Sequence, residues 1–311
     1  MKILVVGNGQ HANKRIIPAL KKLKAVKSII VTDRKSANSV VNLKKKVNTL
    51  NHKAILENKE FYDFIIISSY PSSHLSNVEE FKGKTNNLIV EKPITNNISY
   101  ILSENFKYYY EKNNLIESLM FFHHPFWKYL NTILSKYEFT TLESSFTIPN
   151  TLEKSNFRFN KKLGGSAILD NGIYPVSLIS ELNLKKLQLV KKNISYNNNY
   201  SVDMLGSAVF ESEDIKKIKI KWGIGNSYNN FVKLTNKNIE IFIPFFFSKP
   251  SNLNPTIFIK GKKSITYRNF DQFRSMYSDI FNNNQTTLHY TQYKSIYKRY
   301  NLIKMLLNDK L

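Results

Sequence analysis

Two segments of the chain carry side chains that are suited to proton transfer. In the first, Lys92 stands between Glu91 and Pro93, directly after an apolar run that is typical of a buried strand. An ammonium group at the end of a central strand can hydrogen-bond to a substrate hydroxyl or carbonyl and help to move its proton. In the second, Asp170 and Tyr174 are four residues apart, so a helix would present the carboxylate and the phenol on one face. Such a pair could orient a substrate and exchange a proton with it, although a packing helix capped by Asp170 would have the same spacing.

A glycine-rich turn near the start of the chain is suited to the pyrophosphate of a dinucleotide. It follows an apolar, β-branched run and reads Gly7-Asn8-Gly9-Gln10-His11-Ala12. Gly7 permits a tight turn, Gly9 lets a phosphate approach the backbone, and the small Ala12 lets the next helix pack on the strand. A helix that begins near Gln10 would point its free N–H groups and the positive end of its dipole at the phosphates. The alternative explanation is an ordinary strand–helix–strand unit with a glycine turn.

The second strand of this unit ends in an acidic residue at the expected distance. Asp33 follows the glycine turn at close to the roughly 20 residues at which an acid binds the adenosine ribose hydroxyls. Its charge would repel the 2′-phosphate of NADP, which favours NAD. Arg34 and Lys35 could stack on the adenine or bind that phosphate, so the choice between NAD and NADP stays open with NAD preferred.

Further candidate cofactor residues follow the next strand. Residues 64–69 form a continuous run with β-branched side chains, typical of a strand buried on both faces of a parallel sheet. Ser69, Pro71 and His74 come at its carboxyl end, where such sheets bind cofactors, and His74 opens a helix that we expect to reach residue 81. A capping or packing role would explain His74 equally well. The expected cofactor-binding residues are Gly7, Gly9, Gln10, His11, Ala12, Asp33, Arg34, Ser69, Pro71, His74, Glu91, Lys92 and Pro93.

The remaining pattern predicts two domains. Helices are expected at residues 39–56 and 99–113 and a strand at residues 115–122, as in a parallel sheet with covering helices. From residue 140 onwards, alternating segments separated by polar turns indicate an antiparallel or mixed sheet, and residues 270–310 are expected to be helical. We therefore expect a dinucleotide-binding domain over residues 1–120 and an α+β substrate or oligomerisation domain over residues 121–311. The terminal helix, at about residues 271–311, would dock back on the first domain.

Two adjacent histidines, His123 and His124, stand at the expected boundary between the domains. Paired histidines suggest a metal, but no carboxylate or third ligand stands nearby at a usable spacing, and the chain has no cysteine. We therefore expect a substrate contact or a packing role for both residues and no metal site.

The bulk composition excludes several classes of protein. With 311 residues and 42% hydrophobic side chains, the chain can bury a substantial core. No apolar run approaches the ~18 residues of a membrane span, and the N-terminal run is too short for a signal peptide, so we expect a cytoplasmic protein without membrane contact. The net charge of +23 is spread along the chain without a nucleic-acid-binding motif, so we expect solvated lysines and no nucleic-acid partner. A diffuse positive field would still attract anionic small molecules.

Taken in order, these segments resemble the Gfo/Idh/MocA oxidoreductases, the family of glucose–fructose oxidoreductase and inositol dehydrogenase. The likeness extends over nearly the whole chain and rests on residues 7–12, residues 69–74, Glu91-Lys92-Pro93 and residues 164–174. The resemblance implies that Lys92 is catalytic, often before a cis bond to Pro93. It also implies that Tyr174 is the acid/base, in a branch where Tyr replaces the catalytic His, and that Asp170 contacts substrate or cofactor. Where the family has an asparagine–arginine pair, this chain reads Phe121-Phe122-His123-His124, which removes a common substrate-binding arginine.

The resemblance implies an N-terminal α/β Rossmann domain with a doubly wound parallel sheet and a C-terminal α+β domain with an open, mainly antiparallel sheet. It implies an NAD(P)-dependent oxidoreductase that transfers a hydride between nicotinamide and a sugar or nucleotide-sugar derivative, in carbohydrate or surface-polysaccharide metabolism. A homodimer or homotetramer is expected. Two alternatives stay open: a reductase of a tetrapyrrole or imine on the same fold, and a non-catalytic dinucleotide-sensing regulator. The joint presence of Lys92, Asp170 and Tyr174 argues against the regulator.

Overall fold

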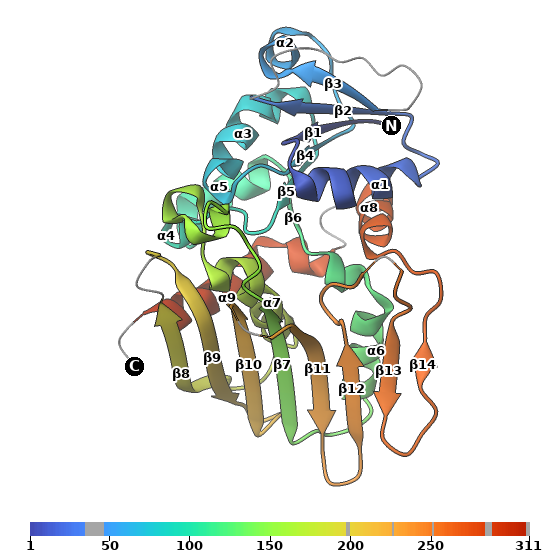
Figure 1. Cartoon of the computed structure of the whole chain (residues 1–311), viewed down its shortest axis with the longest axis vertical. Coiled ribbons are helices and arrows are strands. Elements are labelled where there is room, and N and C mark those ends of the chain that lie inside the picture. The colour runs from blue at the N-terminus through green and yellow to red at the C-terminus, as the bar shows by residue number, and fades with distance from the viewer. Residues whose placement is uncertain (35–46, 197–199, 226, 251, 284–287, 309–311) are drawn as a thin grey trace. The chain divides into compact units, whose positions relative to one another are not determined.

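The computed structural model describes residues 1–34, 47–196, 200–225, 227–250, 252–283 and 288–308 (Figure 1). The chain divides into two compact units. The first unit consists of Met1–Leu119 and Phe273–Tyr293, and the second of Met120–Gln272 and Lys294–Leu311. A segment near the C-terminus therefore belongs to the same unit as the N-terminus.

The first unit is built on a six-stranded parallel sheet with the order β3-β2-β1-β4-β5-β6. The direction of the order reverses between β1 and β4, and doubly wound sheets bind dinucleotides at such a switch point. The central strands β4 and β5 are buried over their whole length, as their continuous apolar runs predict. The strands are β1 (Lys2–Val6), β2 (Ser28–Asp33), β3 (Val47–Asn51), β4 (Phe64–Ile67), β5 (Leu88–Glu91) and β6 (Leu115–Ser118).

Helices cover both faces of this sheet, with α1 and α8 on one face and α3 and α5 on the other (Figure 1). The late helix α8 is fastened to the sheet by side chains: the ring of Phe281 lies 4.5 Å from that of Phe64, and Met276 Sδ lies 3.5 Å from Ser118 Oγ. The α-helices are α1 (Ile17–Lys21), α2 (His52–Glu57), α3 (His74–Phe81), α4 (Ile98–Ile101), α5 (Glu104–Lys112) and α8 (Gln272–Asn282). Shorter 3₁₀ turns lie at Pro71–Ser73, Lys82–Lys84 and His289–Thr291.

The first helical segment begins with a π-helical turn, η1 (Ala12–Ile16), directly before α1. Pro18 is the second residue of α1 and lacks the backbone N–H that a continuous α-helix would use. The wider π turn precedes this missing donor, so the helix passes through Pro18 with its buried face intact.

One predicted helix of the first unit is wrong. Residues 47–51, expected in a helix over residues 39–56, form the edge strand β3, and only His52–Glu57 is helical. Residues 39–46 of that prediction lie outside the described part of the chain. Strand β3 pairs with β2 in parallel, with Val47 opposite Ile29. This pairing is made with a distant segment, and local helix propensity does not report it.

Two further predicted elements have different ends. The helix expected at residues 99–113 is interrupted by Ser103, whose hydroxyl accepts a hydrogen bond from the Phe106 N–H and caps α5. The strand expected at residues 115–122 ends at Ser118, and Met120–His123 forms a 3₁₀ turn, η4.

The second unit is built on an eight-stranded sheet with the order β14-β13-β12-β11-β7-β10-β9-β8. Strands β7 and β10 are parallel and the other neighbouring pairs are antiparallel, which confirms the expected open, mainly antiparallel sheet. Strand β13 was not predicted. The strands are β7 (Thr141–Ile148), β8 (Gln188–Tyr196), β9 (Asp203–Glu211), β10 (Lys217–Ile224), β11 (Asn229–Thr235), β12 (Glu240–Pro244), β13 (Thr256–Ile259) and β14 (Ile265–Thr266).

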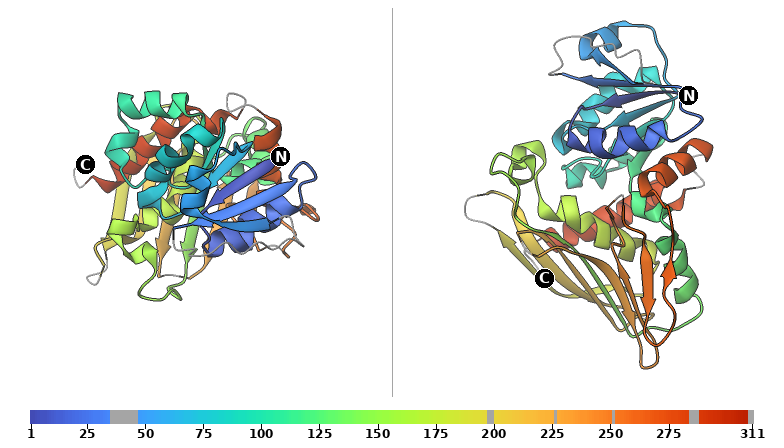
Figure 2. Two further views of the ribbon diagram at one scale, coloured as in Figure 1. Left: turned by 90° about the horizontal axis from the view of Figure 1, so that it is seen from above. Right: turned by 45° about the vertical axis from the view of Figure 1, so that its right-hand side comes forward.

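Two helices, α7 and α9, lie along one face of this sheet (Figure 2). They are joined where Ser295 Oγ donates to Glu181 Oε2 at 3.3 Å. The helix predicted over residues 270–310 is therefore two helices, of which α8 belongs largely to the first unit and α9 largely to the second. The remaining helical segments are α6 (Pro125–Leu134), η5 (Phe157–Phe159), η6 (Lys161–Leu163), η7 (Ile168–Gly172), α7 (Ile173–Glu181) and α9 (Tyr293–Leu307). In the described part of the chain, no helix has the length and apolarity that crossing a bilayer requires.

Candidate active site

The glycine turn after β1 has the geometry of a dinucleotide-binding loop. Gly7 has a φ of +112°, where a side chain would be strained, and an added Cβ would overlap the backbone carbonyl of Ser68. At Gly9 an added Cβ would meet no protein atom within 4 Å. The fold itself therefore requires glycine at position 7, whereas Gly9 leaves an open approach to the backbone that a phosphate could use. Ala12 is fully buried under the first helix, as its small size predicts.

Asp33 ends β2 next to this turn. Its Oδ2 accepts a hydrogen bond from the backbone N–H of Asn8 at 3.3 Å, which joins the acid to the glycine turn. The neighbouring Arg34 forms an ion pair of 2.5 Å with Glu80 on α3. Asp33 thus has the position of a ribose-binding carboxylate. The next residue, Arg34, is paired with a second carboxylate, that of Glu80.

His74 connects two loops at the carboxyl ends of β4 and β5. Its side chain is buried, with Nδ1 2.8 Å from the carbonyl oxygen of Pro93 and Nε2 3.0 Å from that of Ser69. Burial lowers the pKa of His74, and the two carbonyls oppose this shift only in part. A neutral imidazole carries one N–H and donates to one of these carbonyls, while its ring contacts both the loop that carries Ser69 and the loop that carries Pro93.

The Glu91-Lys92-Pro93 segment follows β5 and contains a cis peptide bond before Pro93, as the resemblance implies. Glu91 is buried, and its Oε1 accepts a hydrogen bond from Ser118 Oγ at 2.9 Å and lies 3.4 Å from His11 Nε2. Burial would raise the pKa of Glu91, but His11, Ser118 and Lys92 outweigh it and hold that pKa below its ordinary value. Glu91 is therefore a buried anion, and the half-buried Lys92 follows it at the sheet edge.

These groups lie along one edge of the parallel sheet. Strands β2, β1, β4 and β5 are neighbours in that order, and Val6 of β1 is opposite Thr32 of β2 and Ile67 of β4. Their carboxyl ends therefore meet at one edge, which carries the glycine turn, Asp33, residues 69–74 and Lys92. The open backbone at Gly9, the free N–H groups of the helix start and the acid after β2 fit a dinucleotide at this edge.

In the second unit, Asp170 and Tyr174 lie on one helical segment, as their spacing predicts. Asp170 is in the π turn η7 and Tyr174 is in α7. Asp170 Oδ2 forms an ion pair of 2.5 Å with Nε of Arg158, a residue that we did not predict. The charge of Asp170 raises the pKa of Arg158 against the opposing effect of burial, and the nearby Tyr174 adds to the rise. Asp170 thus holds a guanidinium in the neighbourhood of the Tyr174 phenol.

Tyr174 is fixed by aromatic packing. It is 4% exposed, and its ring centroid lies 5.0 Å from that of Phe146, 5.8 Å from Phe247 and 6.0 Å from Phe121. Its hydroxyl donates to the sulfur of Met120 at 3.6 Å, and thioether sulfur is a weak acceptor. The packing therefore fixes the position of the Tyr174 ring, whereas the hydrogen bond from its hydroxyl to Met120 is weak.

The segment that carries Asp170 and Tyr174 is anchored from behind by the sheet. Asp203 on β9 accepts hydrogen bonds from Ser166 Oγ at 2.5 Å and from the Ile168 N–H at 2.7 Å. Gly206 on β9 leaves room for the indole of Trp222, because an added Cβ there would overlap the ring. Burial raises the pKa of Asp203, although its hydrogen bonds oppose this shift.

The two adjacent histidines have buried side chains. His124 is 2% exposed, and its Nδ1 accepts a hydrogen bond from the Phe126 N–H at 3.1 Å, which caps α6. Burial and the charge of Lys249 lower the pKa of His124 to about 3, so the ring is neutral at physiological pH. No set of three or more metal-ligating side chains occurs among the residues that the structure describes.

Sequence reasoning missed Arg158, Asp203 and Glu80. Each is joined to its partner by a contact between segments that are 12 to 46 residues apart. Such contacts leave no periodic trace in the sequence, and one arginine or carboxylate among many charged residues carries no local signal.

Comparison with known proteins indicates the same oxidoreductase family for the N-terminal part of the chain. The sequence model of GFO_IDH_MocA, an oxidoreductase family with an NAD-binding Rossmann fold, matches residues 1–114. A dTDP-3,4-didehydro-2,6-dideoxy-alpha-D-glucose 3-reductase from Saccharopolyspora spinosa is 23% identical over 270 residues, 84% of this chain and 80% of that relative. A reductase with the same description from Actinomadura kijaniata is 24% identical over 149 residues, 47% of this chain and 45% of that relative.

Two solved structures share the fold over nearly the full length. KijD10, a 3-ketoreductase from Actinomadura kijaniata in complex with NADP and TDP-benzene, has a TM-score of 0.83 at 18% identity, over 98% of this chain and 96% of that one. An aldose–aldose oxidoreductase from Caulobacter crescentus complexed with glycerol has a TM-score of 0.76 at 12% identity, over 98% and 96% of the two chains. The motifs, the sheet order and the family match agree for the first unit: residues 1–114 match the NAD-binding Rossmann fold of the Gfo/Idh/MocA oxidoreductase family.

Proposed function

We propose that the protein reduces a keto group on a nucleotide-activated sugar with NAD(P)H. The observation that carries the proposal is the likeness to a dTDP-sugar 3-reductase over 84% of the chain. This chain also has both candidate catalytic residues, Lys92 and Tyr174. The net charge of +23 supports it, because a positive field attracts a substrate that carries a diphosphate. The setting that follows is carbohydrate or surface-polysaccharide metabolism.

The residues of the chain manage the proton of this reduction. Bound NAD(P)H would supply the hydride to the carbonyl carbon. Tyr174 donates its phenolic proton to the carbonyl oxygen, which becomes a hydroxyl, and recovers a proton from solvent afterwards. The role proposed for the ammonium of Lys92 is to hydrogen-bond to a substrate oxygen and stabilise the negative charge that develops during hydride transfer.

Arg158 and Asp170 support the phenol. Proton donation leaves a tyrosinate, and a nearby guanidinium favours that charged form. Asp170 fixes Arg158 through the 2.5 Å ion pair. In this proposal Asp170 acts as a positioning residue in addition to any contact with substrate.

For the cofactor we propose a preference for NAD(H) over NADP(H). The carboxylate of Asp33 would repel a 2′-phosphate, and the adjacent guanidinium of Arg34 is paired with Glu80. The structure of KijD10 contains NADP, so both cofactors need to be measured side by side. Equal or higher kcat/KM with NADPH than with NADH would contradict the preference.

We also propose a cytoplasmic homodimer or homotetramer. Exposed aromatic side chains on the eight-stranded sheet support an assembly, since they would otherwise contact water. They include Tyr196, Phe242 and Phe258. A monomeric mass in solution, measured by light scattering, would contradict this part of the proposal.

The activity is tested with a panel of dTDP-ketosugars and the oxidation of NADH or NADPH as readout. Lys92→Ala should lower kcat about 10²–10³-fold, because it removes a hydrogen-bond donor that stabilises the developing negative charge. Lys107→Ala, at an exposed lysine of α5, is the control and should leave turnover unchanged.

Three outcomes of this test have different meanings. Undiminished turnover in Lys92→Ala would remove Lys92 from the mechanism. Turnover of an imine or a tetrapyrrole, with no dTDP-ketosugar accepted, would support the non-sugar reductase. Tight dinucleotide binding without turnover of any substrate would support the regulator.

A further inference from the structure

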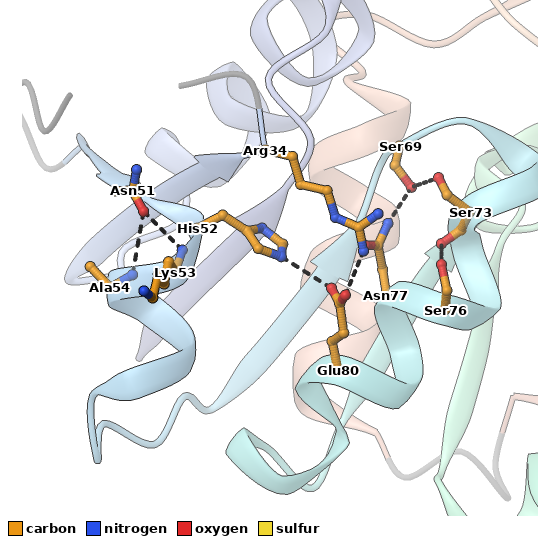
Figure 3. A network of polar contacts seen from close by, with 10 residues as sticks. All are labelled: Arg34, Asn51, His52, Lys53, Ala54, Ser69, Ser73, Ser76, Asn77 and Glu80. Carbon is orange, nitrogen blue, oxygen red and sulfur yellow. Dashed lines mark hydrogen bonds and ion pairs between the residues drawn. The ribbon is translucent and has the colours of Figure 1, made fainter. Parts of the chain in front are cut away.

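A network of charged and polar side chains lies beside the carboxyl end of β2 (Figure 3). Arg34 follows Asp33 there, and its Nη2 lies 2.5 Å from Glu80 Oε1 and 3.4 Å from Asn77 Oδ1. The other carboxylate oxygen of Glu80 lies 3.0 Å from Nε2 of His52. Glu80 thus contacts a basic side chain with each of its two oxygens, and both partners come from other elements of the first unit.

The same network reaches the loop after β4. Asn77 is 4% exposed, and its side-chain N–H donates to Ser69 Oγ at 2.7 Å while its oxygen faces Arg34. Ser73 Oγ donates to Ser69 Oγ at 3.0 Å (Figure 3). Arg34 is therefore connected to two groups of candidate cofactor residues, one after β2 and one after β4.

The position of Arg34 matters for the adenosine end of the cofactor. NAD and NADP differ at the adenosine 2′ position, which carries a hydroxyl in one and a phosphate in the other. The carboxylate of Asp33 suits the hydroxyl, whereas a guanidinium such as that of Arg34 suits the phosphate. Glu80 holds this guanidinium and places a negative charge next to it.

We propose that Glu80 is a positioning residue that sets cofactor preference: it holds Arg34 in an ion pair and thereby weakens binding of an adenosine 2′-phosphate. The inference rests on NAD(P) binding by this family, and it deepens the proposed preference for NAD(H). It predicts that loss of the Glu80 charge releases Arg34 toward a 2′-phosphate and removes a charge that repels one. Because Arg34 and Glu80 are 53% and 33% exposed, their ion pair adds little to the stability of the fold.

The test uses two adenosine fragments, so it needs neither substrate nor turnover. Adenosine 2′,5′-bisphosphate and 5′-AMP differ by the 2′-phosphate alone, and their affinities are measured by titration calorimetry. In Glu80→Gln, the affinity for the bisphosphate relative to 5′-AMP should rise about tenfold, as expected for removing one nearby negative charge and freeing one positive charge. The affinity for 5′-AMP itself should change little.

Glu79→Gln is the matched control. Glu79 is the preceding residue on α3, has the same charge, and pairs at 2.5 Å with Lys82, which directly follows that helix. Its substitution changes the overall charge by the same amount and should leave the affinity ratio unchanged. An equal rise in both variants would mean a general charge effect and would overturn the proposal.

Arg34→Ala and the double variant with Glu80→Gln complete the test. Without Arg34, the substitution of Glu80 should lose most of its effect on the ratio, because the released group is absent. A ratio that is unchanged in Glu80→Gln, or a rise that persists without Arg34, would overturn the inference. The ratio of the two affinities in the wild type tests the NAD(H) preference separately. The titrations use no substrate, so their result stands even if the reductase proposal fails.

Discussion

The two units of the molecule hold their functional side chains in different ways. In the first unit the candidate residues stand on short turns after parallel strands, and backbone atoms fix several of them. His74 lies between two carbonyl oxygens, and Asp33 accepts the N–H of Asn8. In the second unit Tyr174 stands on a buried helical segment, which Asp203 of a distant strand anchors. The first arrangement depends on turn geometry and the second on the sheet behind the helix.

Because of this difference, we expect substitutions to act differently in the two units. In the first unit a change at a turn alters the backbone that receives the cofactor. In the second unit, a change at a side chain can leave the backbone in place and remove either the chemistry or the support of one phenol. Four experiments distinguish these cases, from the largest expected effect to the smallest.

The largest effect is expected from Tyr174→Phe in the second unit. The variant keeps the ring that packs against Phe146 and Phe247 and removes the hydroxyl. We expect kcat to fall about 10²–10⁴-fold, the range for loss of a general acid. The thermal unfolding midpoint should stay near that of the wild type. A kcat close to the wild-type value would show that another group donates the proton.

The glycine turn of the first unit offers a matched pair of substitutions. Gly7→Ala forces a Cβ into the Ser68 carbonyl at a φ of +112° and should lower the free energy of unfolding by about 3 kcal/mol. Gly9→Ala meets no protein atom within 4 Å, so it should leave stability unchanged and weaken NAD(H) binding. Thermal melts and cofactor titrations separate the two outcomes. Equal destabilisation by both substitutions would contradict the distinction.

In the second unit, Arg158→Gln removes the cation that pairs with Asp170. Both side chains are largely buried, at 28% and 13% exposure, so the loss of this ion pair should lower the free energy of unfolding by about 2 kcal/mol. Lys162→Gln, at an exposed lysine of the same segment, is the control and should change it by less than ~0.5 kcal/mol.

Denaturant unfolding followed by tryptophan fluorescence measures this effect. The chain has two tryptophans, and both Trp127 and Trp222 belong to the second unit. A wild-type unfolding midpoint in Arg158→Gln would show that the ion pair does not support the Tyr174 segment.

The smallest effect is expected from acidification, which should act on the two units with opposite sign. In the first unit, burial would raise the pKa of Glu91 and of Glu80, but His11 and Arg34 lead the groups that hold both below 4.5. The stability that these carboxylates contribute is present above that ordinary value and is lost as the pH falls through the lowered pKa. In the second unit, burial raises the pKa of Asp203 above 3.8, so its protonation favours the folded form as the pH falls.

Hydrogen exchange at several pH values checks this prediction, after correction for the intrinsic exchange rate. As the pH falls below about 4.5, protection of β4 and β5 should decrease before protection of β9 and β10. Loss of protection in β9 first, or in both units together, would contradict it.

Several elements of the fold were predictable because their signals are local. The glycine turn, strand β4 and the helix from His74 to Phe81 occur where the sequence places them. Each depends on residues within one short window: a glycine that accepts a φ of +112°, a continuous apolar run, or the start of an amphipathic helix.

The predictions from sequence fail where a distant segment of the chain decides the local structure. Residues 47–51 form a strand because β2 is available to pair with them, and β13 forms beside β12 for the same reason. Arg158 and Glu80 acquire their roles from partners that folding brings to them. A pattern within one window does not contain these partners, so the strands and the two ion pairs could not be predicted from it.

The sequence by itself determined the match of residues 1–114 to an NAD-binding Rossmann fold and the parallel sheet with its dinucleotide loop. It also gave Lys92 and Tyr174 as candidates for the chemistry, because turns and strand ends are encoded within a few residues. Only the tertiary structure decided that Asp170 holds Arg158 and that Glu80 holds Arg34. The physical reason is that the position and the pKa of a charged side chain depend most on the nearest opposite charge. Folding, rather than order along the chain, decides which charge lies nearest.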